Sequence, residues 1–169
     1  MRGLGALCIA AASLGFGLTI LRERRRHIRC LRTLGDALCL LASELGQSRA
    51  PLPQLVRELG GRTARPACGF FQALAEGLAK LGEQSFFEIW SETAAAALPE
   101  LNDTERESLL DAGRHLGRFS PDEQIRALER SAALLADALR REEAAYREGR
   151  KLCLALPTAA GALLVILLL

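Results

Sequence analysis

The sequence contains few of the side chains from which active sites are commonly built. Its two histidines, His27 and His115, lie far apart, each among arginines, and both are expected on the solvated surface. The five cysteines include no C-x-x-C pair and two lie inside long apolar runs, which favours reduced thiols packed as small hydrophobic groups over a metal site or disulfides. There is no glycine-rich phosphate loop, and Ser108 with His115 resembles a nucleophile and base without an orienting residue. We therefore expect no catalytic residue, no cofactor and no metal.

The chain also has little net charge. It contains 22 lysines and arginines against 20 aspartates and glutamates, and every charged residue except Arg2 lies between Arg22 and Lys151. The charged middle is therefore nearly neutral, whereas a nucleic-acid-binding domain presents a strongly basic surface. We expect no nucleic-acid partner.

Uncharged, apolar sequence is abundant at both ends. Leu4–Leu21 and Leu152–Leu169 each hold eighteen residues without a charge. Eighteen helical residues span about 27 Å, close to the hydrocarbon core of about 30 Å. A cleaved signal peptide is the alternative for the first run, but arginines follow it where a small-x-small cleavage site would be needed. We predict a transmembrane segment over 1–22, a cytoplasmic helical domain over 23–150 and a transmembrane segment over 151–169.

Basic residues flank the inner side of both apolar runs. They are Arg22, Arg24, Arg25 and Arg26 after the first run, and Arg150 and Lys151 before the second. Because positive residues stay on the cytoplasmic side of a membrane, we expect the central domain in the cytoplasm and both termini on the opposite face. We interpret these charges as snorkelling groups that fix the topology in the lipid bilayer, rather than as a site for a particular lipid or protein.

The central domain shows helical periodicity and no strand-like alternation. The first helix, over 24–45, carries an apolar stripe at steps of three and four. This stripe consists of Ile28, Leu31, Leu34, Leu38, Leu41 and Leu45. Gly46 is expected to end the helix, and a short helix after Pro51 is expected to break at Gly60-Gly61.

Later helix boundaries are marked by capping residues and by proline. A third helix should begin at Pro66 and bury Leu78 and Leu81. The boxes Ser85-x-x-Glu88 and Thr104-x-x-Glu107 should start the fourth and fifth helices, and Ser120-Pro121-Asp122-Glu123 the last. The expected fold is all-α: a cytoplasmic antiparallel helical bundle flanked by one N-terminal and one C-terminal transmembrane helix. Helices 24–45 and 121–150 are expected to be antiparallel neighbours, with the two spans side by side.

Aromatic side chains gather in two neighbouring helices. Five of the eight aromatic residues lie within about twenty positions, namely Phe70, Phe71, Phe86, Phe87 and Trp90. Burial in the core is the simplest interpretation. Two adjacent phenylalanines cannot both point equally inward from one helix, however. We therefore also consider that one ring of each pair lies at the edge of a groove that docks a partner.

The sequence around the end of the fifth helix carries a recognisable pattern. It contains Gly113-x-x-Leu116-Gly117-Arg118-Phe119, followed by Asp122 and Gln124. Together with Leu31-x-x-Leu34-x-x-x-Leu38, Pro51-Leu52, Tyr146 and the apolar stretch from Gly161 onwards, it resembles the stage III sporulation protein AB family over nearly the whole chain. The departure from that family is Arg118-Phe119-Ser120-Pro121, which is more apolar and richer in proline than the usual polar run.

The resemblance implies a function that composition and spacing do not reveal. Members of that family belong to a channel-like assembly between mother cell and forespore, in the mother-cell-facing membrane around the forespore. Their soluble part is similar to the cytoplasmic domain of the platform protein of type II secretion and type IV pilus systems. The implied partners are the cytosolic secretion-type ATPase and other membrane subunits of the assembly. A non-enzymatic platform or adaptor is therefore expected; the alternative is a membrane-associated enzyme with an unrecognised site in the bundle.

Overall fold

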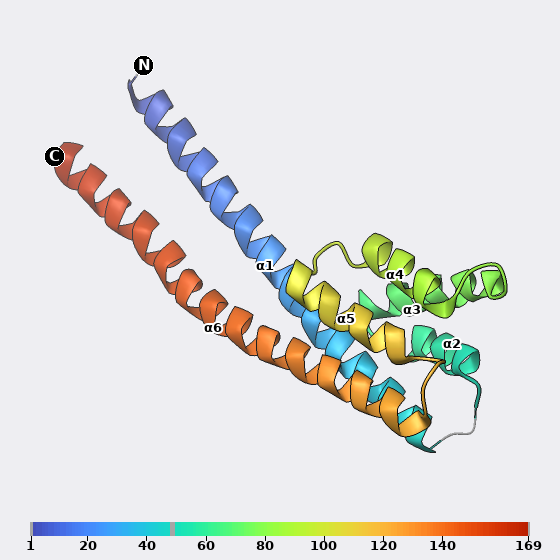
Figure 1. The fold of residues 1–169 in the computed structure, drawn as a ribbon. Helices are drawn as coiled ribbons and strands as arrows, with labels where there is room; N and C mark the ends of the chain where they lie inside the picture. The colour runs from blue at the N-terminus through green and yellow to red at the C-terminus, as the bar shows by residue number, and fades with distance from the viewer. Residues whose placement is uncertain (1, 48–49, 169) are drawn as a thin grey trace. The chain divides into compact units, whose positions relative to one another are not determined.

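The computed structural model is all-helical wherever it describes the chain (Figure 1). It describes residues 2–47 and 50–168, and it describes side chains for Thr19 and for residues 21–47 and 50–149. Within these limits it contains six α-helices, one short 3-10 helix and no β-strand. The all-α fold class predicted from periodicity is confirmed.

The first and last helices are the longest elements of the chain. These are α1 (Arg2–Gln47) and α6 (Pro121–Leu168). The chain divides into two compact units: one is His27–Leu139, and the other combines α1 up to Arg26 with α6 from Arg140 onwards. Because this division reflects contacts within the chain and not contact with a membrane, it does not test the membrane boundaries predicted at 22 and 151. Those boundaries stay a prediction.

In the unit His27–Leu139, α1 and α6 lie side by side. The α1 stripe is buried as predicted at Leu31, Leu34, Leu38 and Leu41, and α6 contributes Leu128, Ala132 and Leu135 to the same core. The Cδ1 atom of Ile125 lies 3.5 Å from where a Cβ on Gly46 would stand, so the end of α1 meets the start of α6. The two helices therefore run antiparallel in this unit, as predicted (Figure 1). Gly46 itself lies inside α1.

Two predictions about the short helices are wrong. Gly60 and Gly61 lie inside α2 (Leu52–Arg62), because Gly60 is a packing position where α3 (Ala67–Gly77) comes close. The Gln72 Nε2 group donates to the Gly60 carbonyl at 3.0 Å, and its Cγ lies 3.1 Å from the position of an added Cβ. Leu81, predicted to be buried, is 49% exposed because the chain becomes extended there, after the 3-10 helix η1 (Leu78–Lys80).

The capping box of α4 (Phe86–Ala97) is confirmed. The Ser85 backbone N–H donates to Glu88 Oε2 at 2.7 Å, and the Glu88 N–H donates to Ser85 Oγ at 3.3 Å. The Ser85 hydroxyl also donates to Glu88 Oε2, at 2.9 Å. The two bonds to Oε2 hold the pKa of the Glu88 carboxyl below its ordinary value, the one from the backbone N–H being the larger cause. The box therefore keeps this carboxylate ionised at the positive end of the helix dipole.

The helix α5 (Asp103–His115) begins earlier than predicted. Its cap is Asn102, whose Oδ1 accepts from Glu105 N at 2.9 Å, while Asn102 N donates to Glu105 Oε2 at 3.0 Å. The predicted Thr104-x-x-Glu107 box is therefore wrong. Both positions have suitable residue types, but Glu105 also bonds to α1, which fixes the box in the earlier register.

Three of the five clustered aromatic rings belong to the core. Phe70, Phe71 and Trp90 are fully buried, and Phe70 meets each of the other two edge-on with ring centroids 5.0 Å apart. Both rings of the Phe70-Phe71 pair therefore lie inside the core, so the alternative that one ring lies at the edge of a docking groove does not hold for this pair. Phe86 and Phe87 are half-buried, and Phe86 packs against this core; a docking role for this pair stays a prediction.

Among the residues whose side chains are described, no helix offers an apolar stretch of the length needed to cross a membrane. The predicted spans, Leu4–Leu21 and Leu152–Leu169, fall outside those residues apart from Thr19 and Leu21. Their transmembrane character stays a prediction.

Candidate functional site

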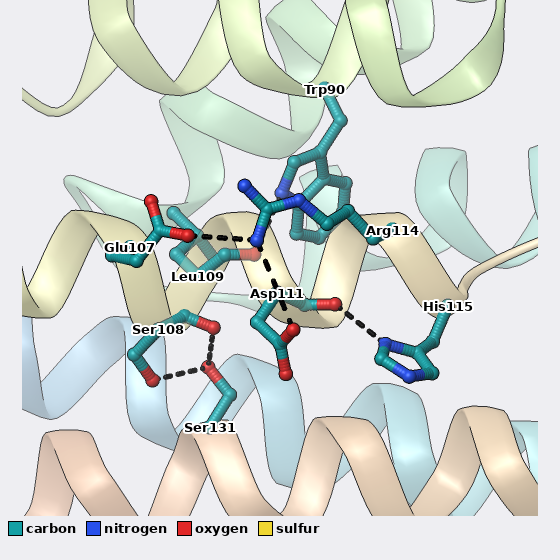
Figure 2. A network of polar contacts seen from close by, with 8 residues as sticks. All are labelled: Trp90, Glu107, Ser108, Leu109, Asp111, Arg114, His115 and Ser131. Carbon is teal, nitrogen blue, oxygen red and sulfur yellow. Dashed lines mark hydrogen bonds and ion pairs between the residues drawn. The ribbon is translucent and has the colours of Figure 1, made fainter.

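The helix α5 is held by one side chain from each of three neighbouring helices. Trp90 of α4 donates its indole N–H to the Leu109 carbonyl at 3.0 Å, and Ser131 of α6 donates its hydroxyl to the Ser108 carbonyl at 2.8 Å (Figure 2). From α1, His27 Nε2 lies 2.7 Å from Glu105 Oε2. Each of these bonds is specific to one side chain, so the position of α5 is fixed more sharply than apolar packing alone would fix it.

The motif residue Gly113 allows α5 to lie against Trp90. A Cβ at this position would stand 2.4 Å from Trp90 Cδ1 and 2.6 Å from Nε1, closer than atoms can approach. Gly113 is itself buried on the face of α5 that meets α4. This glycine is therefore required by close packing rather than by backbone conformation.

The other motif residues build the connection from α5 to α6. Residues 116–120, the motif loop, begin with buried Leu116 and continue with Gly117, whose φ is +76°. The predicted left-handed glycine after α5 is confirmed. Gln124, in the first turn of α6, accepts from Gly117 N at 3.3 Å and donates to the Phe119 carbonyl at 2.7 Å. One glutamine side chain thus ties both halves of the loop to α6.

The start of α6 completes the support of the motif loop. The Ser120 hydroxyl and backbone N–H donate to Glu123 Oε2 at 2.9 and 3.2 Å. These bonds hold the pKa of the Glu123 carboxyl below its ordinary value, the hydroxyl bond being the larger cause. The helix start predicted at Ser120-Pro121 is confirmed.

We expect Gly117→Val to destabilise the protein by about 1–3 kcal/mol, because a β-branched residue is strained at positive φ. No atom outside the neighbouring residues lies within 4 Å of an added Cβ, so strain rather than a clash would be the cause. Gly117→Asn is the control, since asparagine tolerates this conformation better. Thermal unfolding of the full-length protein in mild detergent measures both. Equal melting temperatures for the two variants would contradict the strain argument.

The motif loop presents an aromatic ring to solvent. Phe119 is 49% exposed and stacks on His115 with ring centroids 5.0 Å apart. His115 is half-buried, with its Nδ1 atom 2.8 Å from the Asp111 carbonyl, so its predicted place on the solvated surface holds only in part. Nearby, the Arg114 guanidinium lies over the Phe87 ring, 5.4 Å from its centroid. Arginine and aromatic side chains are enriched at the energetic centres of protein interfaces.

A groove runs between α5 and α6. It encloses about 690 Å³ and is lined on α5 by Asp103, Thr104, Glu107, Ser108 and Asp111, and on α6 by Arg130, Ser131 and Leu134. Ser108 and Ser131 line it from opposite helices, with their Oγ atoms 3.1 Å apart (Figure 2). Because Ser108 is bonded to Ser131 and His115 to a backbone carbonyl, these two residues do not form a nucleophile and base pair.

The sequence contains a signal for the bond between His27 and Glu105 that the prediction of a solvated His27 missed. His27 precedes Leu31 by four positions, on the apolar stripe of α1, and Glu105 precedes Leu109 by four on that of α5. Their side chains are 18% and 5% exposed, respectively. A polar residue on an apolar stripe needs a buried partner, and each of these provides one for the other.

The cysteines of the described region are free thiols, and one is strongly buried. Burial, followed by the nearby carboxylates of Glu100 and Glu105, raises the pKa of the Cys30 thiol to about 12. Cys39 is exposed and Cys68 half-buried. Among the described residues no group of three or more histidine, cysteine or acidic side chains could hold a metal ion.

The basic residues predicted to flank the first membrane span are exposed. These are Arg22, Arg24, Arg25 and Arg26. Arg25 donates to the Tyr146 hydroxyl at 2.6 Å and lies over the same ring, 5.7 Å from its centroid. This contact links the early part of α1 to α6 within their unit. The side chains of Arg150 and Lys151 lie outside the described residues.

Comparison with known proteins gives two findings. The sequence model of a family described as stage III sporulation protein AB matches residues 2–169. A solved structure titled "Stage III sporulation protein AB (SpoIIIAB)" has a TM-score of 0.64 at 23% identity, and the match covers 72% of this chain and 97% of that one. At this identity the structure shows a shared fold. A search of curated proteins finds no match.

Proposed function

The chain belongs to the stage III sporulation protein AB family, which supports a role in sporulation. From this premise we propose that it is a non-enzymatic platform or adaptor subunit of a secretion-like channel complex in endospore formation. It couples a cytosolic secretion-type ATPase to the membrane subunits of that complex. The observation that carries this proposal is the motif loop, which Gln124 fixes at both halves while Phe119 stays half-exposed.

The fixed loop supports a binding role because an ordered surface loses little conformational entropy when a partner docks. Two bonds from Gln124 and the left-handed Gly117 hold the loop in shape before any partner arrives. An exposed aromatic ring on such a loop offers apolar area at low entropic cost. The loop also lies next to Arg114 and Phe87, which extend the same kind of surface.

The proposal includes anchoring at both ends. The runs 4–21 and 152–169 would cross the membrane, with the central domain in the mother-cell cytoplasm and both termini on the opposite face. The exposed arginines at 22 and 24–26 support this orientation, because positive residues favour the cytoplasmic side. A cytosolic motor and the membrane subunits would then both be within reach of one chain.

The polar residues considered above for an enzyme site have structural partners. Ser108 bonds to Ser131, His115 to the Asp111 carbonyl, and His27 to Glu105. These contacts favour the platform over the membrane-associated enzyme, since each group is occupied in holding α5 and its neighbours together.

Membrane flotation of the ATPase tests the proposal. With the chain present, we expect the ATPase to float with the membrane fraction; without the chain, it should stay soluble. Phe119→Ser should lower the membrane-bound fraction roughly fivefold or more, since truncating an interface anchor commonly costs over 1 kcal/mol of binding free energy. Leu81→Ser is the matched control, because Leu81 has the same 49% exposure. An ATPase that stays soluble when the chain is present, or that floats equally without it, would refute the coupling role.

A further inference from the structure

The groove between α5 and α6 combines two features that the motif loop does not use. Its α6 wall carries Leu134, which at 57% exposure is the most exposed large hydrophobic residue of the described region. Its α5 wall carries Asp103, Glu107 and Asp111, spaced by four residues and therefore aligned along one face of the helix. An apolar contact point thus faces a row of carboxylates across a cleft.

The charge of this groove decides which class of partner fits. Three carboxylates and one arginine, Arg130, line it, and the side chains of Glu107 and Asp111 are 62% and 51% exposed. Arg114 lies near both, with its Nη1 atom 2.7 Å from Glu107 Oε1 and 3.9 Å from Asp111 Oδ1 (Figure 2). Three carboxylates against Arg130 and Arg114 leave an excess of one negative charge, which disfavours an anionic lipid surface or a nucleic acid and favours a basic polypeptide.

The length and spacing of the carboxylate row favour an α-helix as the occupant. Ser108 and Ser131, which also line the groove, bond to each other and to the α5 backbone, so their hydroxyl groups are already satisfied. From Asp103 to Asp111 the carboxylate row spans about 12 Å, or roughly two helical turns. A helix with basic residues at steps of four would match the row, and an apolar residue beside them would meet Leu134.

We propose that the groove between α5 and α6 docks a basic amphipathic helix of a partner protein. The lysines or arginines of that helix pair with Asp103, Glu107 and Asp111, and its apolar side chains cover Leu134. The inference extends the proposed platform role, on which it rests, by giving the chain a second docking surface of defined chemistry.

Binding of a synthetic peptide tests the groove directly. The probe is a fluorescent, alanine-based helical peptide of about 15 residues with three lysines at steps of four and leucines beside them; a second peptide has glutamates in place of the lysines. Fluorescence anisotropy with the full-length protein in mild detergent should show binding of the lysine peptide and none of the glutamate peptide. Glu107→Gln with Asp111→Asn should weaken binding about tenfold, and Leu134→Ser about fivefold.

Two further variants test the direction of the charge effect on peptide binding and provide a control. Arg114→Gln should strengthen binding, because it removes the cation that competes for Glu107 and Asp111. Glu129→Gln is the control, since Glu129 is exposed on α6 outside the groove and should leave binding unchanged. Thermal unfolding of each variant confirms that the compared proteins are folded; if the double variant fails to fold, Glu107→Gln alone replaces it, with a smaller loss.

Three results would overturn the inference. One is equal binding to the groove variants and to Glu129→Gln. Another is a loss with the carboxylate variants but none with Leu134→Ser, which would indicate charge attraction without a groove. The third is a protein that mass photometry shows to be a dimer and that binds the peptide only as the dimer dissociates. That result would mean that a second copy of this chain, rather than a partner protein, occupies the groove. None of these results affects flotation of the ATPase, so failure of the groove and failure of the platform role are distinguishable.

Discussion

Replacing Gly113 with alanine should destabilise the protein by about 2–4 kcal/mol, the largest effect expected from a methyl group added at any glycine whose surroundings the structure describes. The added Cβ would stand 2.4 Å from Trp90 Cδ1, and the indole has little freedom to move. Trp90 is fully buried, meets Phe70 edge-on at 5.0 Å and donates to the Leu109 carbonyl at 3.0 Å. Any shift that relieves the clash therefore disturbs a ring contact and a buried hydrogen bond together.

Gly69→Ala is the matched control for this prediction. Gly69 is an exposed helical glycine of α3, and nothing lies within 4 Å of an added Cβ. Since alanine is the better helix former, this variant should be neutral or more stable by up to about 1 kcal/mol. Urea unfolding of the two full-length variants in mild detergent compares them. If Gly113→Ala proves as stable as Gly69→Ala, the packing of Trp90 against α5 is not as described.

A double variant separates the clash from a general loss of stability. In a Trp90→Leu background the indole is gone, so adding Gly113→Ala should cost much less than it does in the natural sequence. The difference measures the coupling between the two positions, which we expect to exceed about 1 kcal/mol. If the changes in unfolding free energy of the two variants simply add, the cost of Gly113→Ala does not come from its contact with Trp90.

The periodicity of the sequence predicted the helices well because it reports burial directly. The stripe from Leu31 to Leu41 and the box at Ser85-Glu88 are found where their residue types placed them. Glycine was less informative, because the sequence does not distinguish a glycine that ends a helix from one that lets another helix approach. Gly117 is of the first kind and Gly60 of the second, and only the second depends on a distant residue, Gln72.

The candidate site was predictable in part. The motif from Gly113 to Gln124 marked the right stretch of sequence, but its chemistry depends on tertiary contacts: Gly113 on Trp90, and Gln124 on two backbone groups of the loop. The groove was not predicted. Its carboxylates and Leu134 come from two helices whose relative register no local pattern specifies.

His27 and Glu105 were missed for a different reason. Each residue, taken alone, is of a type usually found on the surface, and only the position of each on an apolar stripe indicated burial. A histidine on one stripe and a glutamate on another are each unfavourable until they are paired. Their bond joins α1 to α5 and gives each of these groups a side-chain partner.

Replacing His27 with alanine should cost about 3 kcal/mol of folding stability, because it leaves the Glu105 carboxylate buried without its side-chain partner. Glu105 is 5% exposed and would keep only the bond from the Asn102 backbone N–H. His27→Gln retains a side-chain donor near the same place and should cost less, about 1 kcal/mol. Urea unfolding of the full-length protein in mild detergent measures these differences.

The second histidine of the chain provides the control. His115→Ala removes a half-buried ring whose polar contact is with the Asp111 carbonyl, a group already within a helix, so it should cost less than about 1 kcal/mol. Combining His27→Ala with Glu105→Gln removes the orphaned charge, and the double variant should be more stable than His27→Ala alone. A double variant no more stable than His27→Ala would show that the lost stability reflects packing around the imidazole rather than an unpaired carboxylate.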